Sequence, residues 1–424
     1  MTEEFLHFVW HNKLFAQKNY IADTGEEIEI IDTGIRNYDA GPDFFNAKIK
    51  IENTIWAGNV EIHLKSSDWN VHHHNKDKAY NNVILHVVKE YNAPCLNSDR
   101  KNVQTIQLEI PDNYIQNYNL LLKRDQWIPC EKQIIKPDNI IMLKWIERLT
   151  IERLESKTGH ILRILENNKF DWEESFYQIL ARSFGFGVNS EPFEMLAKSL
   201  PLKILAKHKT NIHELQALLF GQSGLLGLNE VNDNFTIILN RDYRHLKNKY
   251  NLVPVDAHLW KFLRLRPVNF PTIRIEQFVN LIYKSSHLLS RIIEAKNINE
   301  MHQLFESKVT DYWHNKYLFG KTTKIKNKDM GKESVHSIII NTVVPFLFLY
   351  GNENGKSEMK EKAVNLLYEI PVEKNNIIIK WQRLGISCTN SFDTQALIHL
   401  KKEYCDKRKC LNCMIGNNLI RNSK

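Results

Sequence analysis

Residues 37–88 constrain the fold of this 424-residue chain more than any other stretch. They read NYDAGPDFFNAKIKIENTIWAGNVEIHLKSSDWNVHHHNKDKAYNNVILHVV, which combines a Gly-Pro turn, acidic residues, histidines and tryptophans with strand-like runs. Residues 45–52 and 56–65 alternate between polar and apolar side chains, and the Asn-Thr pair between them suits a hairpin turn. Residues 83–88 are almost wholly apolar, which is typical of a strand buried on both faces. The stretch therefore predicts a sheet with polar chemistry at one edge.

The flanking patterns extend this sheet and then give way to helices. Residues 3–15 have the spacing of an amphipathic helix, whereas residues 26–31 and 103–110 alternate as strands do. From residue 137 onward, long segments show helical periodicity and are separated by Gly, Pro and Asn. We therefore expect an α+β N-terminal domain followed by a mainly α-helical region. The expected domains are residues 1–135, residues 136–384 and a helical tail at residues 385–424.

Composition places the chain among soluble globular proteins. Hydrophobic residues make up 43% and charged residues 25%, which excludes a disordered chain. The net charge of +8 permits nucleic-acid binding without requiring it. The N-terminus MTEEFLHFVW lacks the basic start and apolar core of an export signal, and the most apolar run, residues 335–350, is too short to span a bilayer. Six cysteines are too few for a disulfide scaffold, so we expect a cytoplasmic protein without a membrane partner.

Two carboxylates within residues 37–88 have the placement of a metal site. Asp43 follows the Gly-Pro turn immediately before one predicted strand, and Glu61 lies inside the next. Because side chains alternate along a strand, Glu61, His63 and Lys65 project from one face. If the two strands pair as a hairpin, Asp43 and Glu61 approach each other at a sheet edge and suit Mg²⁺ or Mn²⁺. His63 or Lys65 would position the metal-activated water or offset developing charge.

The polar segment after the second strand adds further candidates. His72, His74 and Asp77 have a spacing that suits metal ligation, so a zinc hydrolase centred on them is an alternative. We also expect Trp69, His72, His74 and Tyr80 to contact substrate. The Trp69 ring could stack on a base, although packing of the sheet explains it equally well.

The same residues have structural interpretations. An Asp before a strand is common turn chemistry, and Glu-x-His-x-Lys also fits a solvated strand face. His86, inside the apolar strand, fits a histidine whose hydrogen bonds are satisfied within the core.

Three cysteines crowd the C-terminal tail. Cys405, Cys410 and Cys413 form Cys-x4-Cys-x2-Cys in the basic segment KEYCDKRKCLNCMIG. Positive charges favour thiolates, and thiolates at this spacing bind soft metals. Cys388 or His399 could complete a structural zinc or iron–sulfur site. The alternative is three reduced cysteines in a helical tail, with the surrounding lysines and arginine as a solvated face.

The Pro-Asp at Asp43 and the Glu-x-His at Glu61 resemble the PD-(D/E)xK nuclease superfamily, in which a Glu-x-Lys follows the Pro-Asp. The resemblance implies a central mixed sheet with flanking helices and metal-dependent cleavage of nucleic acid. The predicted N-terminal helix fits the expected order, and Glu4 is a candidate for an additional acid. His63 stands where the superfamily has lysine, and Lys65 is a candidate substitute on the same face.

The cysteine segment resembles the C-terminal iron–sulfur loop of endonuclease III-type glycosylases, but it lacks one of their four cysteines. Some PD-(D/E)xK nucleases hold a cluster with C-terminal cysteines and one distant cysteine, which makes Cys95 and Cys130 candidates as well.

Taken whole, the chain resembles DUF2851, a bacterial family of unknown function. The resemblance rests on GPDFFNAKIKI, NVEIHLKSSDW, AYNNVILHVV, LLFGQSGLL, LRPVNFPTIRI and YCDKRKCLNC. It implies a bacterial, soluble, cytoplasmic protein and brings no activity.

Three functions follow from these patterns. The first is a Mg²⁺- or Mn²⁺-dependent nuclease that acts on DNA or RNA through Asp43 and Glu61. The second is a non-catalytic protein that binds nucleic acid or protein on a decayed nuclease core. The third is the histidine-centred zinc hydrolase.

Overall fold

The computed structural model describes residues 1–123, 126–134, 139–227, 233–285 and 287–422. Its backbone contacts divide the chain into two compact units. The first, which we call the sheet unit, comprises Met1–Trp145 and Leu400–Lys424, and the second, the helical unit, comprises Ile146–His399. The sheet unit thus runs past the boundary expected at residue 135 and includes the last part of the tail expected at residues 385–424.

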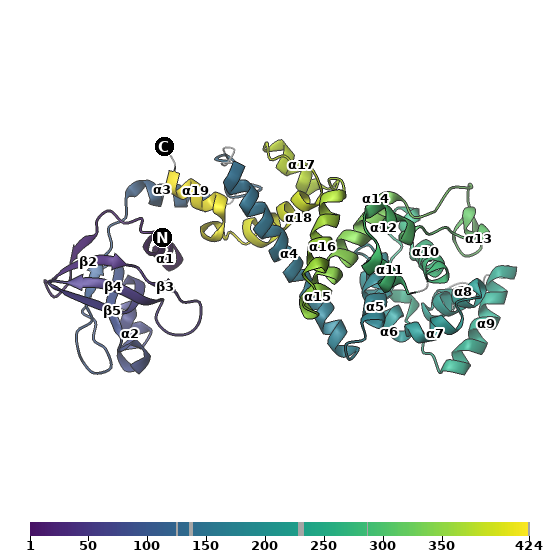
Figure 1. Cartoon of the computed structure of the whole chain (residues 1–424), viewed down its shortest axis with the longest axis horizontal. Coiled ribbons are helices and arrows are strands. Elements are labelled where there is room, and N and C mark those ends of the chain that lie inside the picture. Colours follow the sequence, from purple (N-terminus) through teal and green to yellow (C-terminus); the bar gives the residue numbers. More distant parts are fainter. Residues whose placement is uncertain (124–125, 135–138, 228–232, 286, 423–424) are drawn as a thin grey trace. The chain divides into compact units, whose positions relative to one another are not determined.

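A mixed sheet of seven strands forms the sheet unit (Figure 1). The strand order is β1-β2-β4-β5-β6-β7, and β3 also pairs with β4. Strands β1 to β5 pair with one another in antiparallel fashion. The β5–β6 and β6–β7 pairs are parallel. This confirms the expected α+β class and the mixed sheet. The strands are β1 (Asn19–Ile21), β2 (Glu27–Asp32), β3 (Ile35–Arg36), β4 (Phe44–Ile51), β5 (Thr54–Lys65), β6 (Val83–Glu90) and β7 (Thr105–Gln107).

The predicted hairpin is the β4–β5 pair. β4 ends at Ile51 and β5 begins at Thr54, so the Asn-Thr pair lies at the turn as expected. β6 is buried over most of its length, which fits its apolar sequence. The alternating run at residues 103–110 forms only the three-residue strand β7.

The N-terminal helix α1 (Glu3–His11) packs against β5 and is shorter than the expected residues 3–15. It buries Phe5 and Trp10, and the Trp10 indole donates a hydrogen bond to the Thr33 carbonyl at 3.0 Å. The helix stops because Lys13 adopts a left-handed backbone with φ of 53°. The Asn12 side-chain amide then donates to the Phe8 carbonyl, 2.9 Å away, near the helix end.

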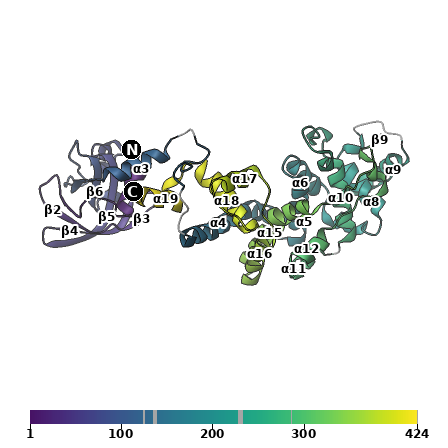
Figure 2. The ribbon, with the colours of Figure 1, turned by 90° about the horizontal axis from the view of Figure 1, so that it is seen from above.

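The C-terminal tail docks on α3 (Asp112–Leu121), and its last helix α19 (Met414–Asn422) lies beside α3 (Figure 2). The Arg408 guanidinium donates to the Leu122 and Lys123 carbonyls at 3.3 and 2.9 Å, just past the end of α3. A cation there satisfies carbonyls that a helix end leaves without partners. The two chain ends therefore belong to one folded unit.

Helices build the helical unit, as expected from residue 137 onward. Two helices, at Ser190–Ser199 and Leu202–Lys207, are separated around Pro201, because proline disfavours a helical residue before it. A small antiparallel hairpin, β8 (Lys316–Leu318) and β9 (Lys321–Thr322), interrupts the helices of this unit. The helices that lie wholly or mostly here are α4 (Asn139–Asn167), α5 (Trp172–Phe184), α6 (Ser190–Ser199), α7 (Leu202–Lys207), α8 (Ile212–Gln222), α9 (Asn234–Tyr250), α10 (Pro271–Lys284), α11 (Leu288–Glu294), α12 (Ile298–Phe305), α13 (Asp311–His314), α14 (Lys332–Ile338), α15 (Val344–Glu353), α16 (Ser357–Glu369), α17 (Asn376–Arg383) and α18 (Ser391–His399).

One continuous helical segment, Lys332–Glu353, is long and apolar enough to cross a membrane by those two criteria alone. However, 72% of its apolar window is buried inside the protein. This degree of burial is typical of a helix in a protein core.

The helical unit has its own buried polar network, which explains part of the stretch LRPVNFPTIRI. Arg274 is 4% exposed and donates to Asn269 and Gln277 at 2.6 and 2.8 Å. Two residues further along α10, the buried Glu276 carboxylate accepts from the Gln216 amide at 3.0 Å. Arg274 therefore braces helices, whereas Arg266 lies on the surface.

Candidate metal centre

A polar loop sets the position of Asp43 at the start of β4. The Asn37 side chain donates to the carbonyls of Asp39 and Pro42 at 3.1 and 3.0 Å, and its oxygen accepts from the Asp39 backbone. Gly41 has a φ of +105°, which a residue with a side chain rarely adopts. Asn37 and Gly41 therefore explain why the sequence NYDAGPD holds a carboxylate at a sheet edge.

Asp43 and Glu61 meet across the β4–β5 pair, as predicted. The Asp43 backbone N–H donates to Glu61 Oε2 at 3.1 Å, and the Ile62 N–H donates to Asp43 Oδ2 at 2.9 Å. Each carboxylate is thus held by the other strand's backbone. Burial raises the pKa of Glu61, and the nearby Asp43 charge adds to the rise.

Three histidines converge beside Glu61. His63 Nε2 lies 3.0 Å from His72 Nδ1, and ligand atoms of His63, His72 and His74 all fall within 4.8 Å of one another. Among the described residues this is the one group of three His, Cys, Asp or Glu ligand atoms with that spacing. His73, between the last two, has a left-handed backbone with φ of 62° and lies exposed. The histidine run therefore supplies two members of the cluster and leaves its middle residue outside.

The contact between His74 and Glu61 has the chemistry of a cation site. His74 Nε2 lies 3.3 Å from Glu61 Oε1, and His63 Nε2 lies 3.6 Å from the same oxygen. His74 Nε2 is buried and lacks the geometry of a hydrogen bond to any partner. A buried nitrogen without a hydrogen bond is costly unless another ligand satisfies it. A metal ion shared by these atoms would satisfy both the nitrogen and the carboxylate.

Behind His63, a chain of hydrogen bonds fixes which nitrogen carries the proton. Burial lowers the pKa of His63 to about 2 and of His86 to about 3, so both rings are neutral and each carries one N–H. Cys95 Sγ lies 3.2 Å from the Ser66 carbonyl, which can only accept, and 3.3 Å from His86 Nδ1. With the thiol hydrogen given to the Ser66 carbonyl, the shorter of the two contacts, the sulfur accepts from His86 Nδ1–H.

The order of donors then continues to His63. His86 Nε2 is left with a lone pair and accepts from His63 Nδ1–H at 2.8 Å. His63 Nε2 consequently presents its own lone pair to the cluster, which is the form that a metal ligand needs. His86 is thus buried and hydrogen-bonded, as expected, but it also orients a cluster member.

The helix α1 contributes two residues that the sequence patterns did not single out. His7 Nε2 lies 3.1 Å from Asp43 Oδ2, and His7 Nδ1 faces the Arg36 guanidinium at 3.3 Å. Burial raises the pKa of Glu3, whose electrostatic neighbours include His7 and Asp43. Glu4, the acid suggested by the superfamily resemblance, is exposed. Helical spacing could have found the pair, because residues four apart share a helix face.

Several predicted site residues lie elsewhere. The exposed Lys65 ammonium approaches Glu90 at 3.9 Å, away from the cluster. Asp77 caps the turn that follows by accepting from the Ala79 N–H at 2.9 Å. Trp69 is fully buried and donates from its indole to the Leu96 carbonyl at 2.8 Å, so it is not available to stack on a base. Tyr80 stacks on His74 with ring centroids 3.8 Å apart and supports that ligand directly.

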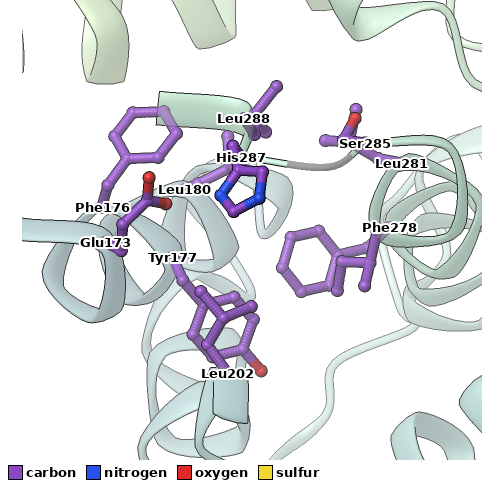
Figure 3. Close-up of a pocket in the computed structure, with 11 residues that line it drawn as sticks. Glu173, Phe176, Tyr177, Leu180, Leu202, Phe278, Leu281, Ser285, His287 and Leu288 are labelled. Carbon is purple, nitrogen blue, oxygen red and sulfur yellow. The ribbon is translucent and has the colours of Figure 1, made fainter. Parts of the chain in front are cut away.

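A mainly apolar cavity lies in the helical unit between α5 and α10 (Figure 3). Phe176, Leu180 and Phe278 give it apolar walls, and the Tyr177 hydroxyl is engaged with the Leu200 carbonyl at 3.0 Å. Glu173 lies at its edge (Figure 3). The cavity has no group of convergent ligands comparable to that in the sheet unit.

Fold and site together define an α+β protein with a largely buried histidine–carboxylate cluster built on β5 and the segment that follows it, joined to a helical unit. The chain belongs to the family described as "Protein of unknown function (DUF2851)", whose model matches residues 3–376. No curated protein and no solved structure matches the chain. The family match ends before the three C-terminal cysteines, so it covers the histidine cluster and not the cysteine segment.

Proposed function

We propose that the sheet unit is a metal-dependent nuclease whose ion is held by Glu61 together with His63, His72 and His74. The observation that supports it is that ligand atoms of three imidazoles lie within 4.8 Å of one another, and that two of these imidazoles, those of His63 and His74, also contact the buried Glu61 carboxylate. Imidazole nitrogens suit Mn²⁺, Fe²⁺ or Zn²⁺, whereas Mg²⁺ prefers oxygen ligands. The proposal retains the expected chemistry but replaces the two-carboxylate Mg²⁺ site with a nitrogen-rich one, and it favours Glu61 over Asp77 as the acidic ligand.

A bound ion of this class would activate a water molecule and polarise a phosphoryl oxygen. The residues around it are placed to handle the proton and the substrate. Asp43 is partly exposed and has His7 at 3.1 Å, so its carboxylate can take a proton from an attacking water. His72 lies at the exposed side of the cluster, where substrate would arrive.

Phosphodiesters are the substrate class that the fold favours. What supports this class is the N-terminal helix and the mixed sheet that carries Asp43 and Glu61 on its β4–β5 pair, since the PD-(D/E)xK resemblance implies such a sheet with flanking helices. The net charge of +8 is compatible with a polyanionic substrate. Six cysteines without disulfides suit a reducing cytoplasm, which is where we place the protein.

The test is metal content and cleavage measured on the same purified full-length chain. We expect one Mn²⁺, Fe²⁺ or Zn²⁺ per chain at this site and cleavage of DNA or RNA in its presence. The His72→Ala/His74→Ala double variant should lose the ion, and Glu61→Gln should lose cleavage. His73→Asn is the matched control, because it changes the neighbouring exposed histidine and suits the left-handed backbone.

Two results would contradict the proposal in different ways. A bound ion without cleavage of any tested nucleic acid would exclude the nuclease and leave a hydrolase of another substrate or a binding protein. Full activity with Mg²⁺ in the double histidine variant would exclude the nitrogen-rich site and restore the two-carboxylate one.

A further inference from the structure

Four cysteine thiols meet at one place in the sheet unit. Cys405, Cys410 and Cys413 of the tail line a small cavity together with Cys130, which lies far earlier in the chain. All four are free thiols rather than disulfides. The tail thus brings three thiols to a fourth one in the N-terminal part of this unit.

Close contacts on both sides of the tail cysteines hold them in this position. The Tyr404 ring packs edge-on against Trp145 with centroids 5.2 Å apart. A Cβ at Gly416 would lie 2.3 Å from the Cys410 carbonyl oxygen, so α19 approaches the cysteine loop as closely as only glycine allows. α19 begins directly after Cys413, whose carbonyl accepts from the Asn417 N–H at 2.8 Å. The loop that carries Cys405, Cys410 and Cys413 is therefore packed closely against the residues before it and against α19 after it.

We propose that Cys130, Cys405, Cys410 and Cys413 together ligate an iron–sulfur cluster that fastens the C-terminal tail to the N-terminal part of the sheet unit. Four thiolates are the complete ligand set of such a cluster. The site shares no residue with the histidine cluster and does not depend on the proposed nuclease activity.

Spacing favours a cluster over a single zinc ion. Tetrahedral zinc with Zn–S bonds of about 2.3 Å needs its sulfur atoms about 3.8 Å apart. In the described part of the chain, no three of these thiols lie within 4.8 Å of one another. A cluster distributes its thiolates over more than one iron atom and accommodates wider spacing.

The structure also selects the fourth ligand. The small cavity is not lined by Cys388, His399 or Cys95, the other candidates from the sequence, and Cys95 is engaged with His86. Cys130 replaces them because it lines the cavity itself.

The basic residues of the tail are engaged locally. Lys401 pairs with Asp406, and Lys407 pairs with Glu403. Together with the hydrogen bonds of Arg408 beyond α3, these pairs give Lys401, Lys407 and Arg408 partners within the sheet unit.

The experiment is analysis of iron, acid-labile sulfide and zinc in the full-length protein purified without oxygen, or reconstituted with ferrous iron and sulfide. We expect two or four iron atoms and as many sulfides per chain beyond the ion of the histidine cluster. Cys130→Ser should lose them, whereas Cys388→Ser should keep them. One zinc ion and no sulfide would overturn the cluster, and so would thiols that remain empty after reconstitution. Retention by Cys130→Ser with loss in Cys388→Ser would overturn the ligand assignment.

Alkylation of the wild-type protein gives the same answer without a variant that could fail to fold. Cys130, Cys405, Cys410 and Cys413 should be protected from iodoacetamide until the iron is removed by a chelator, whereas Cys388 should react in both states. Labelling of Cys130 before iron removal would overturn its role. The His72→Ala/His74→Ala variant should keep its sulfide and cluster iron, so failure of either proposal leaves the other intact.

Discussion

The imidazoles of His63 and His86 share a buried hydrogen bond of 2.8 Å between Nδ1 and Nε2. His86 lies on β6 beside Glu61 in the parallel register of β5 and β6, so the strand pairing itself sets this contact. His86 is in turn hydrogen-bonded to the thiol of Cys95. Which nitrogen of His63 carries the proton therefore depends on two residues, His86 and Cys95, that are not among the proposed metal ligands.

His86→Asn should therefore weaken metal binding without removing a ligand. Loss of a partner that orients a metal-binding histidine typically reduces affinity about 10- to 100-fold. Competition with a chromogenic chelator for Zn²⁺ or Mn²⁺ would measure the change, with His73→Asn as the control that keeps the wild-type affinity. An unchanged affinity in His86→Asn would show that the hydrogen bond to His63 does not orient a ligand.

The same buried histidines should make the metal-free protein sensitive to acid. The pKa values of His63 and His86 fall to about 2 and 3 in the native state, against about 6.5 in an unfolded chain. Below pH 6.5 the unfolded state binds protons that the native state does not, so the free energy of unfolding falls as the pH falls. Each histidine contributes up to about 1.4 kcal/mol per pH unit in this window.

Urea unfolding followed by tryptophan fluorescence between pH 7 and pH 4 would measure this slope. His86→Asn removes one of the two groups and should give a shallower dependence than the wild type. Equal slopes for the two proteins would mean that His86 takes up a proton in the native state.

His7→Gln should lower the turnover rate of cleavage strongly and change the melting temperature little, because His7 faces Asp43 beside the cluster. Loss of a group that assists proton transfer costs about 10²- to 10⁴-fold in rate. The comparison is Glu4→Gln, a neighbour on the exposed side of α1 that should retain full activity. Turnover rates and melting temperatures of the three proteins would separate the two effects.

Gly34→Ala should destabilise the sheet unit. Gly34 has a φ of +81°, and a Cβ there would lie 2.5 Å from the Phe45 carbonyl oxygen. Gly25 also has a positive φ, +96°, but a Cβ there would meet nothing within 4 Å. Gly25→Ala therefore isolates the backbone strain, and the clash at Gly34 should add about 1–3 kcal/mol to the loss in unfolding free energy. Equal losses in chemical denaturation would contradict the clash.

Much of the sheet could be predicted because the alternation of polar and apolar residues that marks a strand depends only on neighbouring positions in the sequence. The alternation along β4 and β5 and the Asn-Thr turn between them identified the hairpin, and the hairpin brought Asp43 and Glu61 together as expected. Alternation also placed Glu61 and His63 on one buried face. It failed at Lys65, because this residue ends the strand and its side chain reaches solvent near Glu90.

The remaining partners come from contacts that local patterns do not encode. His7 reaches Asp43 from α1, His86 reaches His63 from β6, and Cys130 reaches the tail cysteines across most of the chain. The sequence by itself determined the strands, the hairpin and the chemical types of residue available. Only the tertiary structure decided which of them meet, because burial and strand pairing select neighbours without regard to their separation along the chain.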